Sequence, residues 1–323
     1  MQSKTVAILK CNQKRLRKNG VSCKMYDIGG ASMNKYVSLI MDIEKSKTYG
    51  ITERNEMQNY ISKCIENLNF LFGEEMQFDV MFSAGDELQG LFNDVVTALL
   101  YFRILEMLVK PVKIRAGIGI GDWTVKMLHG SSTQQDGPAY HKARHAIEEA
   151  HRMQLQNIRI CSDSDDDILA NHLINAALPL KRQQIYMQNI VQVLIELLFP
   201  FVSQKTVLKK YDAVTELIET KFEYRLGAKN VDSISKRKLD IGQRHLNLDI
   251  ERYEFPIYID GYMTDVESVI IKKNTAMIIS EILQCSRQNV DTIMRRGNAN
   301  KIRELDYVAL QYVERHYGGD RWN

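Results

Sequence analysis

Two aspartates stand where apolar strands are expected to end. Asp42 follows the run YVSLIM, and Asp86 lies between the runs FDVMF and LQGLF. An unpaired carboxylate in a protein core is costly, whereas enzymes that act on nucleotides use such carboxylates to hold paired divalent ions. The two aspartates therefore predict a site for Mg2+ or Mn2+, with Glu87 as either a third ligand or the partner of a nearby cation. The structural alternatives are a helix cap at Asp42 and a turn residue at Asp86.

Hydrophobic periodicity predicts the elements that position these aspartates. Gly85 permits a tight hairpin turn beside Asp86. The order of elements is βαββαβ, the ferredoxin-like unit of an α+β protein, in which the end of the first strand lies beside the central hairpin. We expect strands at 36–41, 78–82, 88–92, 113–120 and 158–161, and helices at 53–72, 94–109 and 139–153.

Composition excludes several classes of protein. The chain has 323 residues, of which 45% are apolar and 26% charged, as in a globular protein of roughly two domains. Its five cysteines are scattered without CxxC spacing, so neither a disulfide framework nor a zinc knuckle is indicated. Apolar runs such as NIVQVLIELLFPFV end short of the roughly 18 residues that span a bilayer. We therefore expect a cytoplasmic protein without a membrane helix.

Changes in charge and periodicity divide the chain into five segments. The first holds seven Lys or Arg and one acidic residue, which is typical either of a nucleic-acid-binding arm or of a solvated extension. The predicted segments are a basic extension at 1–32, the α+β domain at 33–162, a helical region at 163–226, an insertion or linker at 227–273, and a C-terminal helical segment at 274–323.

Four motifs occur in a fixed order: DIEKSK, FSAGDELQGLF, VKIRAGIGIGD and DGPAYHKARHAIEEA. Over residues 33–161 this order resembles the SatD family of bacterial proteins. The motifs also look like the core of class III nucleotide cyclases, which have a metal-binding aspartate on the first strand and a helix that approaches the triphosphate. The resemblance implies a nucleoside triphosphate bound through two divalent ions in a site shared by a homodimer. The GIGIG glycines alone indicate only a close approach of backbone.

The resemblance also implies roles for residues around the two aspartates. Asp42 and Asp86 would hold Mg2+ or Mn2+, and Ser46 and Lys47 would lie at the phosphates, following backbone amides that face the anion. Arg115 is a candidate for bidentate contact with a carboxylate or phosphate. Because strand side chains alternate between faces, a solvated Arg115 is the alternative.

The last of the four motifs departs from the cyclase pattern. Class III cyclases carry an Asn and, four residues later, an Arg that stabilises the transition state, and this chain has His141 and His145 there. Both, with Arg144, are catalytic candidates; phosphate contact, metal binding at i, i+4 spacing and surface packing are open roles for the histidines. The purine-reading Lys and its acidic partner fall on Phe82 and Gln134, so typical purine recognition is not supported.

The segment TAMIISEILQCSRQNVDTIMRRG, at 275–297, has the apolar spacing of two short helices around a turn at Gln284 to Ser286. It resembles a helix-turn-helix, which the SatD family also carries at its C-terminus. Residues 272–303 hold seven basic and two acidic side chains. DNA binding and a protein contact are both open. The second helix would present the following residues to phosphates and base edges: Arg287, Gln288, Asn289, Thr292, Arg295 and Arg296.

Two functions follow from these observations. The first is a cyclase-like protein that binds a nucleoside triphosphate and forms a cyclic nucleotide. The second is a non-catalytic regulator in which the bound nucleotide changes how the C-terminal segment binds DNA.

Overall fold

A computed structural model gives the fold of the chain. It describes residues 35–318 apart from 84, 128, 204–210, 224–255, 265–269 and 271. The described residues belong to one compact unit, Asn34–Asn323. The predicted basic extension lies outside the described residues, as does most of the segment expected to be an insertion.

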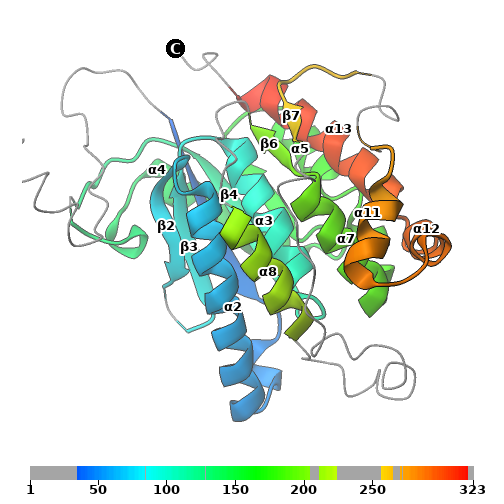
Figure 1. Cartoon of the computed structure of the whole chain (residues 1–323). Helices are drawn as coiled ribbons and strands as arrows, with labels where there is room; N and C mark the ends of the chain where they lie inside the picture. Colours follow the sequence, from blue (N-terminus) through cyan, green and yellow to red (C-terminus); the bar gives the residue numbers. More distant parts are fainter. Residues whose placement is uncertain are drawn as a thin grey trace, which may run out of the picture. The chain divides into compact units, whose positions relative to one another are not determined.

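A five-stranded mixed sheet contains residues of the first three motifs, and the fourth motif lies in a helix packed against it (Figure 1). The strand order is β2-β3-β1-β4-β5. Neighbours among the first four strands pair antiparallel, and β5 pairs parallel with β4. The predicted α+β class is therefore confirmed. The strands are β1 (Tyr36–Ile43), β2 (Met76–Phe82), β3 (Glu87–Phe92), β4 (Ile114–Gly121) and β5 (Ile158–Cys161).

Helices cover both faces of this sheet. On one face α2 (Ile51–Phe72) and α3 (Val95–Val109) share a hydrophobic cluster with Leu39 and Met41 of β1. On the other face α4 (Pro138–Arg152) packs on Ile40. Successive side chains of a strand point to opposite faces, so β1 is apolar on both, as expected for a strand that is buried between two helical layers.

Glycines of β4 allow α4 to lie directly on the strand. A Cβ atom added to Gly119 would be 2.0 Å from the carbonyl oxygen of Ala139, and one added to Gly117 would be 2.2 Å from that of Ala143. Both are contacts with helix backbone, which cannot rotate away as a side chain can. The GIGIG motif is therefore explained by the close packing of α4 on the sheet.

The rest of the described chain is mainly helical. The helices are α5 (Asp167–Ile174), α6 (Leu178–Gln183), α7 (Tyr186–Leu198), α8 (Tyr211–Glu223), α11 (Thr275–Leu283), α12 (Arg287–Arg296) and α13 (Ala299–Tyr317). A short strand, β6 (Phe201–Ser203), pairs parallel with β7 (Ile257–Ile259). The sequence pattern predicted neither short strand, because three residues are too few to show an alternation.

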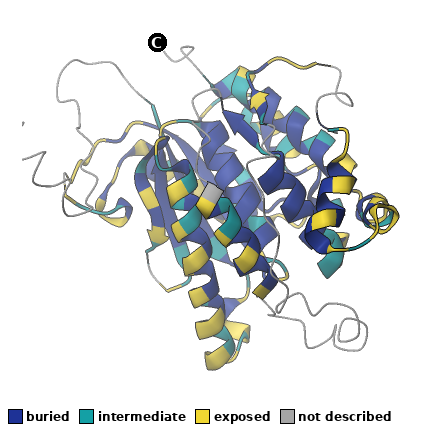
Figure 2. Ribbon diagram, in the orientation of Figure 1, coloured by how far each residue is buried: buried dark blue, intermediate teal, exposed yellow. Residues whose placement is uncertain are grey.

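Helix α3 is buried along almost its whole length, which Figure 2 shows as a nearly continuous dark blue ribbon. Its residues contact α2 on one side and α7 and α13 on others. This explains why the α3 sequence is apolar around its full circumference rather than along one stripe. By contrast, α2 has an apolar face toward the core and exposed polar residues on its outer face.

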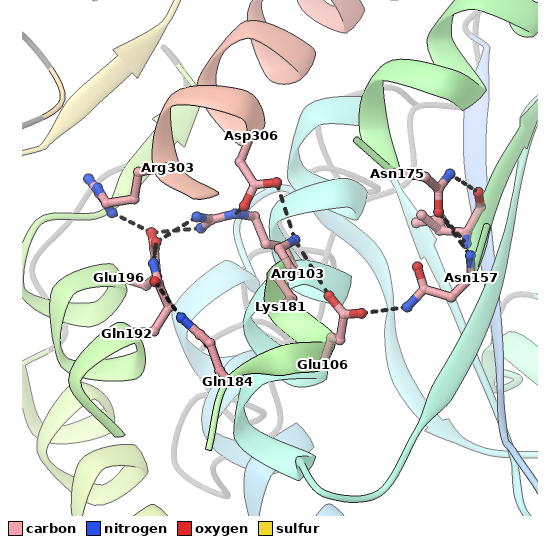
Figure 3. A network of polar contacts seen from close by, with 11 residues as sticks. Arg103, Glu106, Asn157, Asn175, Lys181, Gln184, Gln192, Glu196, Arg303 and Asp306 are labelled. Carbon is pink, nitrogen blue, oxygen red and sulfur yellow. Dashed lines mark hydrogen bonds and ion pairs between the residues drawn. The ribbon is translucent and has the colours of Figure 1, made fainter. Parts of the chain in front are cut away.

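A network of buried charges joins α3 to the C-terminal helices (Figure 3). Arg103 of α3 forms ion pairs with Glu196 of α7, at 2.6 Å, and with Asp306 of α13, at 2.7 Å. Arg303 of α13 also pairs with Glu196. Lys181 extends the network, at 3.2 Å from Asp306 and 3.5 Å from Glu106. The six charged groups of this charge network are Arg103, Lys181, Arg303, Glu106, Glu196 and Asp306, so the two signs balance.

Candidate functional site

Asp42 lies in a row of charged residues at one end of the sheet. In the strand register it is opposite Glu87 of β3 on one side and Arg115 of β4 on the other. Directly opposed residues of neighbouring strands project to the same face. Because Asp42 is two residues beyond Ile40, this is the face that α4 covers.

The two oxygens of Asp42 have different surroundings. Oδ2 is 2.7 Å from Nε2 of His151, in the last turn of α4. Oδ1 is buried and has no hydrogen-bond partner among the described residues. Burial raises the pKa of Asp42 above its usual value, although His151 and Arg115 act in the opposite direction. Removing an oxygen of a carboxylate from water without a partner is unfavourable, so Asp42 Oδ1 is an acceptor that lacks a donor or a cation.

The β2–β3 hairpin brings further acidic groups to this end of the sheet. Gly85 has φ 67°, which permits the turn, and Asp86 follows it. The charge of Asp86 is close enough to raise the pKa of Asp42. Glu87 accepts a hydrogen bond from Ser83 Oγ at 2.9 Å. Burial alone would raise the pKa of Glu87, but hydrogen bonds from Arg144 and Ser83 lower it below its usual value.

Helix α4 supplies two side chains that contact the carboxylates of this row. Arg144 donates to both carboxylate oxygens of Glu87, with Nη2 at 2.8 Å from Oε1. His151 follows seven residues later, two turns along the same helix face. The predicted catalytic residues His141 and His145 are instead exposed, with His141 Nε2 3.3 Å from Asp136 Oδ1. The structure thus brings Arg144, but neither predicted histidine, to the carboxylates at the end of β1. We call Asp42, Asp86, Glu87, Arg144 and His151 the Asp42 site.

The residues predicted to contact phosphate differ in how far they are buried and in whether they are paired. Ser46 is buried, and its carbonyl oxygen accepts from Arg54 Nη2 at 3.2 Å. Lys47 is exposed. Arg115 forms an ion pair of 3.3 Å with Glu44, and its side chain is 24% exposed. Arg115 is therefore mostly covered and paired rather than solvated.

Sequence reasoning missed His151. It gave two roles for Glu87, of which the contact with Arg144 corresponds to the pair with a nearby cation. The signal for His151 was available in principle, because it repeats the position of Arg144 after two helical turns. The sequence does not show how closely α4 packs on the sheet next to β1, because this depends on the contacts of α4 with the glycines of β4.

The described residues include no group of three or more His, Cys, Asp or Glu side chains placed to hold a metal ion. Magnesium commonly takes one or two protein carboxylates and completes its shell with water and substrate phosphates. Asp42, with its unpartnered oxygen, and Asp86 fit such a cation. Oxygen donors of this kind suit Mg2+ and Mn2+.

The C-terminal helices α11 and α12 are joined by a tight turn. Gln284 adopts the left-handed conformation at the end of α11, with φ 49° and ψ 48°, a position that usually favours glycine. Ser286 caps α12 by accepting from the backbone N–H of Asn289. Val290 and Met294 are the buried residues of α12. Of the predicted contact residues, Thr292 is half-buried and the others are exposed: Arg287, Gln288, Asn289, Arg295 and Arg296.

The chain is thus a mixed α+β protein with an acidic site at the end of its first strand. It belongs to the SatD family, whose model matches residues 36–236. No curated protein significantly matches the chain. No helix among the described residues combines the length and the apolar character needed to cross a membrane.

Two solved structures, both described as a bacterial light-regulated adenylyl cyclase, resemble the chain weakly. The first is 13% identical, with a TM-score of 0.30 over 49% of this chain and 53% of that chain. The second is 17% identical, with a TM-score of 0.29 over 40% of this chain and 76% of that chain. The chain therefore spans about half the length of the first.

Proposed function

We propose that the Asp42 site binds a nucleoside triphosphate together with divalent metal ions, Mg2+ or Mn2+. The observation that carries the proposal is Oδ1 of Asp42, a buried carboxylate oxygen without a hydrogen-bond partner among the described residues. Asp86 adds a second carboxylate to the same end of the sheet. Two carboxylates are the number that Mg2+ often takes from a protein when phosphates supply other ligands.

The sheet supports assignment to the ferredoxin-like, cyclase-type class of domain. Strand order β2-β3-β1-β4, with antiparallel neighbours, is consistent with a βαββαβ unit in which the second hairpin strand, β3, lies beside β1. Such a topology would present the end of β1 and the hairpin to one ligand. A palm-type site on such a sheet needs both, because its metal ligands come from two separate strands.

Within this site the residues of the chain have distinct tasks. Asp42 and Asp86 would hold the ions, which when bound neutralise the charge of the triphosphate. The exposed Lys47 is a cation available to phosphate oxygens. Both terminal nitrogens of Arg144 donate to Glu87, so Arg144 would orient that carboxylate. In a cyclisation reaction the ribose 3′ oxygen would form a bond to the α-phosphorus, the bond from that phosphorus to the β-phosphate bridge would break, and pyrophosphate would leave with the proton lost from the hydroxyl.

A homodimer would place the predicted histidines where they can act. His141 is 72% exposed and His145 is also exposed, so neither is committed to the interior of its own chain. In a site shared between two copies, these side chains would contact the triphosphate that the other copy holds.

Titration calorimetry with each of the four nucleoside triphosphates and Mn2+ tests the proposal. Asp42→Asn should abolish metal-dependent binding, because the neutral amide is a poor ligand for a divalent ion. Asp79→Asn is the matched control, since Asp79 is exposed on β2. Chromatography of the same mixtures for a cyclic product then separates a cyclase from a binding protein. Equal affinities of the wild type and Asp42→Asn would reject the site.

A second function is favoured by α12. We propose as the alternative that the chain is a nucleotide-sensing regulator that binds DNA through α12. The exposed side of this helix carries Arg287, Arg295 and Arg296, with one acidic residue, Asp291, paired with Arg287. Arg296→Ala should weaken binding to genomic DNA fragments and reduce its dependence on salt. Lys301→Ala, on the following helix α13, is the control. DNA binding that is equal in both variants would contradict this role for α12.

A further inference from the structure

His151 lies beside the proposed metal ligand Asp42, but it is not one of the residues that the order of motifs implicates. Its Nε2 lies 2.7 Å from Asp42 Oδ2. We infer that His151 is itself a ligand of the ion held by Asp42, and that it makes the site prefer a first-row transition-metal ion over Mg2+. This inference rests on the proposed function, because it requires an ion at Asp42.

The distance between the two donor atoms suits a shared cation. Ligand atoms at about 2.1 Å from a metal and at right angles to each other are about 3 Å apart. The observed 2.7 Å is close to this value. A small rotation of the imidazole would therefore convert the present hydrogen bond into two bonds to one ion, without a change in the backbone.

The placement of His151 in α4 makes this rotation feasible. The ring is 46% exposed, so it can move without displacing core residues. The helix that carries it is held firmly, because the backbone of α4 at Ala139 and Ala143 rests on Gly119 and Gly117. His151 thus has a firmly held backbone, and only its side-chain torsions need to change when it binds an ion.

The identity of the donor atom leads to the metal preference. Mg2+ prefers oxygen ligands and keeps much of its water. Imidazole nitrogen binds first-row transition metals more strongly, and affinity for such a site rises from Mn2+ to Co2+. A site in which the carboxylate of Asp42 was the protein ligand would discriminate weakly between these ions. With His151 included, Co2+ should bind more tightly than Mg2+, and most of the difference should depend on this one side chain.

Cobalt binding to the full-length chain tests the inference. Titration calorimetry and the visible absorption of Co2+ should show, for His151→Ala, a loss of Co2+ affinity larger than the roughly 10-fold to 100-fold that removal of an outer-shell partner costs. Mg2+ affinity should change by less than about 3-fold. His172→Ala is the matched control, because His172 is exposed on α5, away from the Asp42 site. His151→Gln is a second variant, which retains a hydrogen-bond donor for Asp42 and guards against misfolding.

The outcomes distinguish a failure of the role inferred for His151 from a failure of the proposed metal site. If Asp42→Asn abolishes Co2+ binding while both His151 variants retain wild-type affinity, the inference is overturned and the proposed metal site stands. Higher affinity in His151→Ala would also overturn it, because His151 would then be a competitor for Asp42. If Asp42→Asn leaves Co2+ and Mg2+ binding unchanged, the proposed metal site itself fails.

Discussion

Glu196 is the residue on which the charge network depends, and its replacement by Gln should strongly destabilise the protein. The Glu196 side chain is 1% exposed. It pairs with Arg103 and Arg303 and accepts from Gln192 at 2.7 Å. Burial alone would raise the pKa of Glu196, but the two arginines lower it below its usual value. The carboxylate is therefore ionised in the folded protein.

The expected magnitude follows from the balance of charge. Glu196→Gln keeps the shape of the side chain but leaves the charge network with one excess positive charge. Both guanidinium groups are buried, with side chains 7% and 1% exposed, so water cannot replace the lost carboxylate. Breaking a buried ion pair by removing one partner costs about 3–5 kcal/mol. We expect this loss in the free energy of unfolding.

Urea unfolding followed by circular dichroism measures this loss. The midpoint should fall while the dependence on urea concentration stays the same, since the change affects stability and not the surface exposed. Glu304→Gln is the matched control, because Glu304 pairs with Lys301 at the surface and such pairs contribute about 0–1 kcal/mol. A loss below about 1 kcal/mol for Glu196→Gln would refute the reasoning that the network is buried and balanced.

Two further predictions concern α4 and α8. Gly119→Ala should lower the melting temperature, because its Cβ would be 2.0 Å from the carbonyl oxygen of Ala139. Gly50→Ala is the control and should change the melting temperature little, because the nearest atom to its Cβ would be at 3.8 Å. Equal melting temperatures of the two variants would contradict the close packing of α4. Burial lowers the pKa of Lys221 to about 7, below the value of about 10.4 in an unfolded chain. The unfolded chain therefore binds more protons between these values, and the free energy of unfolding should rise with pH across this window. Lys221→Met should remove that rise in urea unfolding measured from pH 7 to pH 10, and an unchanged slope would contradict it.

The sequence predicted the elements around the Asp42 site because each one has a strong local signal. Alternation and apolar runs mark β1 and the hairpin, and Asp94 marks the start of α3, where it accepts from the N–H of Thr97 at 2.8 Å. The acidic residues could be placed at strand ends for the same reason. These signals involve only a few neighbouring residues, so they can be recognised in a single sequence.

The interactions that the sequence did not reveal are long-range. Arg103 and Asp306 are 203 positions apart, and nothing in the local pattern around either residue indicates that they meet. The approach of His151 to Asp42 depends in the same way on how α4 packs across β1. Such contacts follow from the tertiary arrangement of helices, which periodicity does not determine.

The most direct test of the account is a crystal structure of the protein grown with Mn2+ and a non-hydrolysable nucleoside triphosphate, with anomalous scattering recorded for manganese. The account predicts an anomalous peak at about 2.2 Å from a carboxylate oxygen of Asp42, with triphosphate density beside it. A nucleotide bound elsewhere, with no manganese peak at Asp42 and its contact with His151 unchanged, would contradict the central claim.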